Sequence, residues 1–200
     1  MVFDLLELEI ACVRWSELPA NGETLEEVPG YLRLLAKAPN EQAADGAYRS
    51  IDQLVSSQCR LFDAALAIIR PLLAIAATSS SEIGRRLSIE MLDELGSAYP
   101  DPSDAEALHP AERCREMVVG GILEYYRALN GKDPLLRDQA LWTISRHDPD
   151  RERRALAVEW VMNHDFDDRV RHSASRIHNN SEFEFSWVNA ELKERLARGL

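Results

Sequence analysis

The densest group of side chains that could bind a metal lies near the C-terminal end of the sequence. It contains His164, Asp165, Asp167, Asp168, His172 and His178. Imidazole and carboxylate are common zinc ligands, but two ligands on one helix must be three or four residues apart. His172 and His178 are six residues apart, so a helix places them on different faces. We therefore expect helix caps at the aspartates, and neither a metal nor another cofactor.

Residue patterns for covalent or nucleotide chemistry are missing from the sequence. Ser79, Ser80 and Ser81 have no neighbouring motif, and neither GxSxG, GxGxxG nor a P-loop occurs. The histidine–glutamate dipeptides of helical-repeat di-iron hydroxylases are also absent. We expect that the protein is not an enzyme.

Carboxylates in loops are the better candidates for function, because loops often carry binding residues. Two segments with such carboxylates are predicted, a loop at 97–108 and a link at 179–186. Large aromatic side chains are the usual anchors of a protein interface. The predicted partner-binding residues are Asp101, Asp104, Glu106, Tyr125, Trp142, Glu182 and Glu184.

The charge of the chain restricts the class of partner. The net charge is −11, divided as −7 over residues 1–100 and −4 over residues 101–200. A nucleic-acid partner requires a basic surface, so the balance disfavours one. Two interpretations stay open: a basic protein partner, or an acidic surface that only keeps the protein soluble.

The cysteines and the apolar segments indicate a cytoplasmic protein. Cys12, Cys59 and Cys114 are scattered without CxxC spacing, as expected for a reducing compartment. The first residues lack the basic region of a signal peptide. The longest apolar stretch, 64–77, is too short to span a membrane.

One short pattern recurs and indicates how the chain is organised. A polar break, an arginine a few residues later and then apolar residues at helical spacing occur at 80–95, 133–144, 148–161 and 165–177. Helices that cannot bury their faces alone must stack on one another. We predict one all-α domain over 1–200, a HEAT/armadillo-like α-solenoid of about nine or ten helices.

Proline, glycine and aspartate set the expected helix boundaries. Pro71 should kink or split a helix over 60–77, and Gly96 should end the following helix. One helix is expected over 110–129, where Gly120-Gly121 allows close packing. Asp133-Pro134 and Asp148-Pro149 should each open a helix. A last helix should run from Trp187 to about Arg198, and no strand is predicted.

The recurrent arginines are Arg85, Arg86, Arg137, Arg153 and Arg171. They could form a basic strip for phosphate, or they could pair with an aspartate or a carbonyl of a neighbouring repeat. Carboxylates flank them in the sequence, which favours the structural role.

Residues 28–95 resemble bacterial HEAT-repeat proteins in the order of their helices. The landmarks are Pro29, the Leu34-Leu35 pair, Ala43-Ala44, Pro71 and Arg85-Arg86. That group often has His-Gln-Gly between its second and third helices, where this chain has Ser57-Gln58-Cys59. Members of the group often act as immunity proteins against polymorphic toxins. The resemblance therefore implies a protein that binds one partner, a basic toxin domain, and blocks its active site. A general scaffold or assembly adaptor is the alternative. A helical-repeat DNA glycosylase is a third possibility, which the acidic charge disfavours.

Overall fold

The computed structural model describes residues 4–18, 25–57, 60–61, 63–98 and 105–179, and they are almost entirely helical. Ten α-helices, two 3₁₀-helices and one pair of two-residue strands follow one another along these residues. The elements are α1 (Leu5–Ala11), η1 (Trp15–Glu17), η2 (Leu25–Glu27), α2 (Val28–Ala36), α3 (Glu41–Val55), β1 (Ser56–Ser57), β2 (Arg60–Leu61), α4 (Asp63–Thr78), α5 (Glu82–Ser97), α6 (Ala105–Gly120), α7 (Ile122–Ala128), α8 (Pro134–His147), α9 (Arg151–His164) and α10 (Asp168–Asn179). The predicted all-α class is confirmed.

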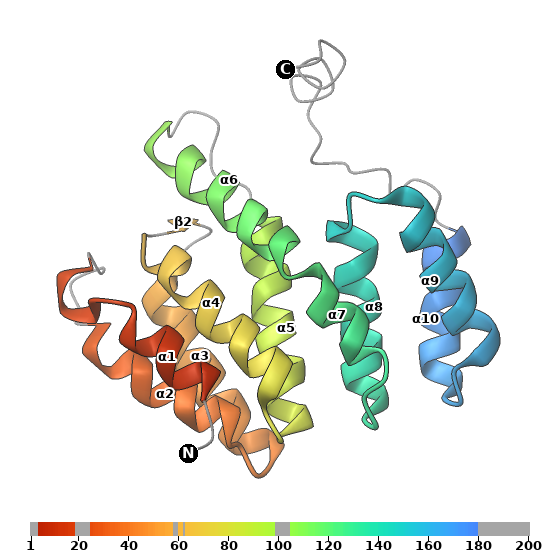
Figure 1. The fold of residues 1–200 in the computed structure, drawn as a ribbon, viewed down its shortest axis with the longest axis horizontal. Helices are drawn as coiled ribbons and strands as arrows, with labels where there is room; N and C mark the ends of the chain where they lie inside the picture. The colour runs from red at the N-terminus through yellow and green to blue at the C-terminus, as the bar shows by residue number, and fades with distance from the viewer. Residues whose placement is uncertain (1–3, 19–24, 58–59, 62, 99–104, 180–200) are drawn as a thin grey trace.

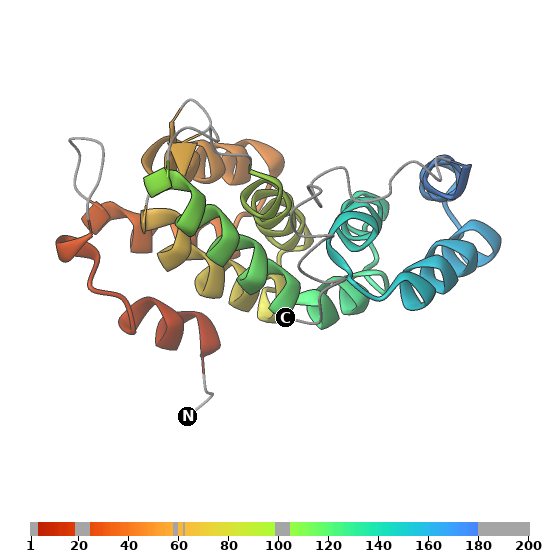
Figure 2. The same ribbon diagram turned by 90° about the horizontal axis from the view of Figure 1, so that it is seen from above.

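The helices lie in two layers, and each packs against its neighbours (Figure 1). The view from above shows α3, α5, α8 and α10 side by side in one layer (Figure 2). The other layer contains α1, α4, α6, α7 and α9. Helices consecutive in the chain thus tend to alternate between layers, and each pair packs on the next.

The apolar core is divided into two clusters. The larger one runs from α1 to α8 and includes fully buried Leu35, Ile68 and Leu92. The smaller one lies under α8, α9 and α10 around Leu141 and Val170. Helix α8 contributes to both clusters, so it joins the C-terminal helix pair to the rest of the molecule.

The structure of residues 56–78 differs from the sequence prediction in two ways. Helix α4 continues through Pro71, so of the two predicted effects, a kink or a split, the split is wrong. Ile68, Ile69 and Leu72 are fully buried there, and packing of this kind offsets the hydrogen bond that proline removes. The helix begins at Asp63, because β1 and β2 pair as a minimal antiparallel hairpin that the sequence did not predict.

Two further differences between the predicted and the observed helix bounds involve glycines at helix contacts. The helix expected over 110–129 is interrupted at Gly121, the N-cap of α7. A Cβ on Gly121 would lie 2.2 Å from Cδ2 of Leu73, so the glycine packs closely against α4 and a larger residue would require the Leu73 side chain to move. Close packing is therefore confirmed for Gly121, whereas a Cβ on Gly120 meets nothing within 4 Å. Gly96 lies inside α5 against His147 and does not end the helix.

The starts of helices in the C-terminal half follow from aspartate and proline. Asp133 caps α8, accepting the Leu135 N–H at 2.9 Å, with Pro134 as the first helical residue. Helix α9 is capped by Asp150, not by Asp148, which instead ends α8. Helix α6 starts at Ala105, within the expected 97–108 loop, because Ala105 to Leu108 favour a helix.

Candidate functional site

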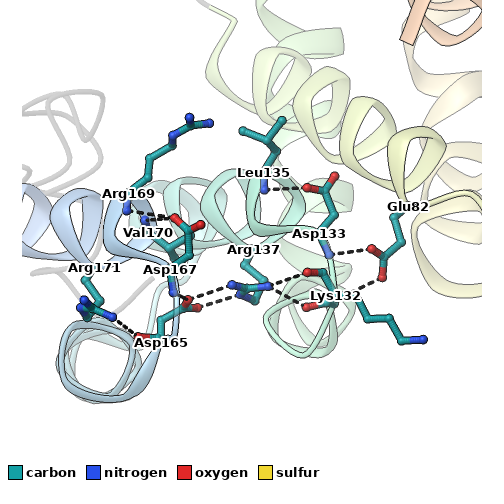
Figure 3. A network of polar contacts seen from close by, with 11 residues as sticks. Glu82, Lys132, Asp133, Leu135, Arg137, Asp165, Asp167, Arg169, Val170 and Arg171 are labelled. Atoms are coloured by element: carbon teal, nitrogen blue, oxygen red, sulfur yellow. Dashed lines mark hydrogen bonds and ion pairs between the residues drawn. The ribbon is translucent and has the colours of Figure 1, made fainter. Parts of the chain in front are cut away.

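Arg137 is the centre of a polar network that joins three helix pairs (Figure 3). Its guanidinium forms a two-pronged pair with Asp165, Nε to Oδ2 at 2.7 Å and Nη2 to Oδ1 at 2.8 Å. Its Nη1 donates to the carbonyls of Gly131 and Lys132, both at 3.0 Å. The side chain thus connects the turn before α8 to the turn before α10.

Glu82 extends this network to α5. Its carboxylate accepts the backbone N–H groups of Lys132 at 2.8 Å and Asp133 at 2.6 Å. At the other end Asp165 accepts the Asp167 N–H at 2.9 Å (Figure 3). Burial alone raises the pKa of Asp165, but the bonds from Arg137 and from Asp167 N–H outweigh it and hold the pKa below its ordinary value.

A second aspartate paired with an arginine, Asp148, lies in the turn before α9. Arg153 forms a two-pronged pair with this carboxylate at 2.8 and 2.7 Å, and the Tyr126 hydroxyl donates to it at 2.6 Å. Arg154 donates to the Asp148 carbonyl at 2.8 Å, as Arg171 does to the Asp165 carbonyl at 2.6 Å. Both arginines stand six residues after their aspartate.

The remaining recurrent arginines also have acceptors. Arg85 donates to the Ala76 carbonyl at 2.8 Å, and Arg86 donates to Glu41 on α3 at 2.5 Å. Arg86 and Arg137 pair with a carboxylate of a neighbouring helix pair, as predicted, whereas Arg85, Arg153 and Arg171 bond to the helix end or turn that precedes their own helix. Because all five already bond to acceptors of the chain itself, their arrangement favours the structural role over a phosphate strip.

His147, Asp93 and Ser97 form a buried polar cluster between α5 and α8. These are the residue types of a catalytic triad, but they are not arranged as one. His147 Nε2 lies 2.9 Å from Asp93 Oδ1 and 3.4 Å from Ser97 Oγ. A catalytic histidine uses its two nitrogens separately, one toward the acid and one toward the nucleophile. Here both partners share Nε2, while Nδ1 is buried without a partner. The His147 side chain is 0% exposed, so a substrate cannot reach it.

The exposed surface of α3 and α5 carries a group of carboxylates, which we call the acidic face. Its residues are Glu41, Asp45, Asp52, Glu90 and Glu94. The two helices pack side by side in one layer, which brings the two rows together (Figure 2). The Tyr48 hydroxyl of α3 donates to Glu94 of α5 at 2.6 Å.

Burial and like charges raise the pKa of two carboxylates in the acidic face. Burial raises the pKa of Glu90, and the charges of Asp93, Glu41 and Asp45 add to this rise against the opposing effect of Arg86. Burial also raises the pKa of Glu94, with further contributions from the carboxylates around it. The guanidinium of Arg86 lies between Glu41 and Glu90, at 2.5 and 3.6 Å, and does not offset this excess.

Trp142, a predicted anchor, lies further along the same layer and is half-buried. The guanidinium carbons of Arg146 and Arg176 lie 5.6 and 5.8 Å from the centre of its ring. Trp142 therefore remains accessible in part.

Tyr125, the other predicted anchor, requires a correction. Its side chain is 0% exposed, and its hydroxyl donates to the Val118 carbonyl at 3.1 Å. A partner cannot touch it, because the apolar spacing of α7 directs it into the core. Asp101, Asp104, Glu182 and Glu184 lie outside the described residues. Glu106 falls in the first turn of α6, and its side chain also lies outside them.

The acidic face was not predicted, although the sequence contained a signal for it. Glu41 and Asp45 are four residues apart on one predicted helix, and Glu90 and Glu94 are four apart on another. This spacing places each pair on one side of its helix. What the sequence could not show is that α3 and α5 are neighbours.

A shallow groove of about 350 Å³ lies between α2 and α3. Its walls contain Leu34, Pro39 and Ala43 among others, and no carboxylate, histidine or cysteine. In the described part of the chain no three metal-binding side chains gather into a possible metal site. No helix there has both the length and the apolarity needed to cross a membrane.

Comparison of the chain with models of protein families, with curated proteins and with solved structures yields no match. The resemblance to HEAT-repeat proteins therefore stays a prediction from residue pattern, and the function must be argued from the surface itself.

Proposed function

We propose that this chain is a non-enzymatic protein-binding module that uses the acidic face to bind one basic protein partner. The observation that carries the proposal is the gathering of these carboxylates on two adjacent helices, where burial and, to a smaller extent, neighbouring carboxylates raise the pKa of Glu90 and Glu94. Carboxylates held together in this way repel one another in the free protein. Basic side chains of a partner would relieve this repulsion, so binding would be favoured.

The architecture fits a short HEAT-like array. Successive helix pairs pack on one another, and the turns at Asp148 and Asp165 repeat the same contacts. In each turn an aspartate caps the backbone two residues later, at 2.9 Å. Arrays of this kind present one row of helices as a continuous binding surface. Helices α3, α5, α8 and α10 would form that row here.

Within this class, an immunity protein is the most specific form of the proposal. The partner would be a bacterial toxin domain whose basic substrate groove is covered by the acidic face. Complementary charge would make association fast, and the covered groove would exclude substrate.

Co-expression with the product of the neighbouring gene tests this proposal. The chain should protect cells from a toxic neighbour, and the E90Q/E94Q variant should protect poorly, because glutamine keeps the shape and removes the charge. The matched control is E112Q/E116Q, which removes two exposed charges at the same spacing on α6. A neighbour that is equally lethal with and without the chain contradicts the proposal.

A general scaffold is the second candidate, and an apolar surface on the other layer favours it. Leu156 and Trp160 are 66% and 52% exposed, four residues apart on α9. A scaffold requires two separate binding surfaces, and these side chains would supply the second. Purification of a multi-subunit assembly that the L156S/W160S variant fails to retain would support this function.

A further inference from the structure

Trp142 lies between two guanidinium groups, and we call Trp142, Arg146 and Arg176 the Trp142 cluster. Arg146 is one helical turn after Trp142 on α8, and Arg176 reaches it from α10. The side chain of Arg146 is 40% exposed, and Arg176 is exposed. Tryptophan and arginine are the residue types that most often dominate binding energy at protein interfaces. The ring also restricts both guanidinium groups before any partner arrives.

The Trp142 cluster lies in the same layer of helices as the acidic face, because α8 packs against α5 (Figure 2). The buried carboxylate of Asp93 on α5 pairs with Arg146 and with His147 of α8. Arg146 is therefore held against α5, the helix that carries Glu90 and Glu94. Along this layer, the surface changes from carboxylates over α3 and α5 to guanidinium groups over α8 and α10.

Positive charge predominates at the α10 end. Among the described residues, no carboxylate forms an ion pair with the exposed side chains of Arg169 or Arg176, whereas Arg171 pairs with Asp168. Asp138 of α8 is close enough for both arginines to act on its pKa, but it is half-buried beside Ser173. His172 and His178 are also exposed on α10. A partner that carried only positive charge would be repelled here.

We infer that the Trp142 cluster binds a carboxylate of the same protein partner that the acidic face binds. The partner then presents a basic patch and, beside it, an acidic side chain. This inference rests on the proposed function. A guanidinium that already lies over a ring can pair with a carboxylate at a lower entropic cost. Two regions of opposite sign also fix the orientation of the partner, which a purely acidic surface cannot do.

Titration of the full-length chain with two short peptides tests the inference by NMR. The acidic probe is acetyl-GEGEG-amide and the basic probe is acetyl-GKGKG-amide, both at low ionic strength. The acidic probe should shift the indole N–H signal of Trp142 and the side-chain signal of Arg176. The basic probe should shift signals of α3 and α5 around Tyr48. R176Q should weaken binding of the acidic probe about two- to fivefold, the range for one exposed ion pair, and leave the basic probe unaffected.

R113Q is the matched control, because Arg113 is an exposed arginine on α6. It removes the same charge far from the Trp142 cluster. Equal weakening by R113Q and R176Q, or no shift at Trp142, overturns the inference. Dimerisation of the chain alone that R176Q abolishes also overturns it, since the occupant would then be a second copy. Failure of the basic probe to bind at α3 and α5 counts against the proposed function instead, so the two failures are distinguishable.

Discussion

Asp165 joins α8 to the turn before α10 through one buried carboxylate. Its side chain is 4% exposed, pairs with Arg137 and accepts the Asp167 N–H. Removing one partner of a buried pair leaves the other charge unpaired. D165A should therefore lower the free energy of unfolding by about 3 kcal/mol. Urea unfolding followed by circular dichroism measures this loss.

Asp168 provides the control for that measurement. It is three residues later, its side chain is 91% exposed, and it pairs only locally with Arg171. D168A should change the free energy of unfolding by about 0.5 kcal/mol or less. Similar losses for both variants would show that the Arg137 network does not hold the helix pairs together.

The lowered pKa of Asp165 gives this contribution a pH dependence. A carboxylate whose pKa is lower in the folded protein binds fewer protons there than in the unfolded chain. Its stabilisation is complete above the ordinary carboxyl pKa and is lost as the pH falls through the folded value. The difference in stability between wild type and D165N should thus be full at neutral pH and shrink in acid. Urea midpoints at pH 7, 5 and 3 test this, and a difference independent of pH contradicts it.

At the scale of elements, Gly84 sets the distance between α2 and α5. A Cβ at this position would lie 2.3 Å from the backbone oxygen of Leu35, which cannot move without moving α2. G84A should therefore destabilise the protein by about 1–3 kcal/mol, the usual cost of overpacking. The measurement is the thermal midpoint, which should fall by several degrees.

Gly46 on α3 is the matched glycine, because a Cβ there meets nothing within 4 Å. G46A should raise the midpoint, since alanine stabilises a helix by about 0.5–1 kcal/mol relative to glycine. Midpoints that move in the same direction in G84A and G46A would refute this account of helix spacing.

Helix boundaries were predictable where a local signal determined them. Asp133-Pro134 opens α8 as expected, because capping acts within a few residues. The continuation of α4 through Pro71 and the interruption of the helix at Gly121 were not predicted, because they depend on the tertiary structure. Burial of the neighbours of Pro71 favours a continuous α4, and Gly121 lies where α7 packs closely against Leu73 of α4.

At the scale of the whole molecule, the sequence predicted helices but not which of them are neighbours. The acidic face exists because α3 and α5, separated by α4 in the chain, lie side by side in one layer (Figure 2). The predicted loop carboxylates stay a prediction, because their side chains lie outside the described residues, whereas Tyr125 was assigned to the surface although it is buried. Exposure and adjacency are tertiary properties, so a single sequence could give the charge of the surface without its location.

The central proposal is that Glu90 and Glu94 bind a basic protein partner. Calorimetric titration of the purified neighbouring gene product with wild type, E90Q/E94Q and E112Q/E116Q tests it most directly. We expect E90Q/E94Q to weaken binding by about tenfold or more, because two interfacial charges are lost, and the control to change it by less than about twofold. Equal affinities for the two double variants would contradict the account.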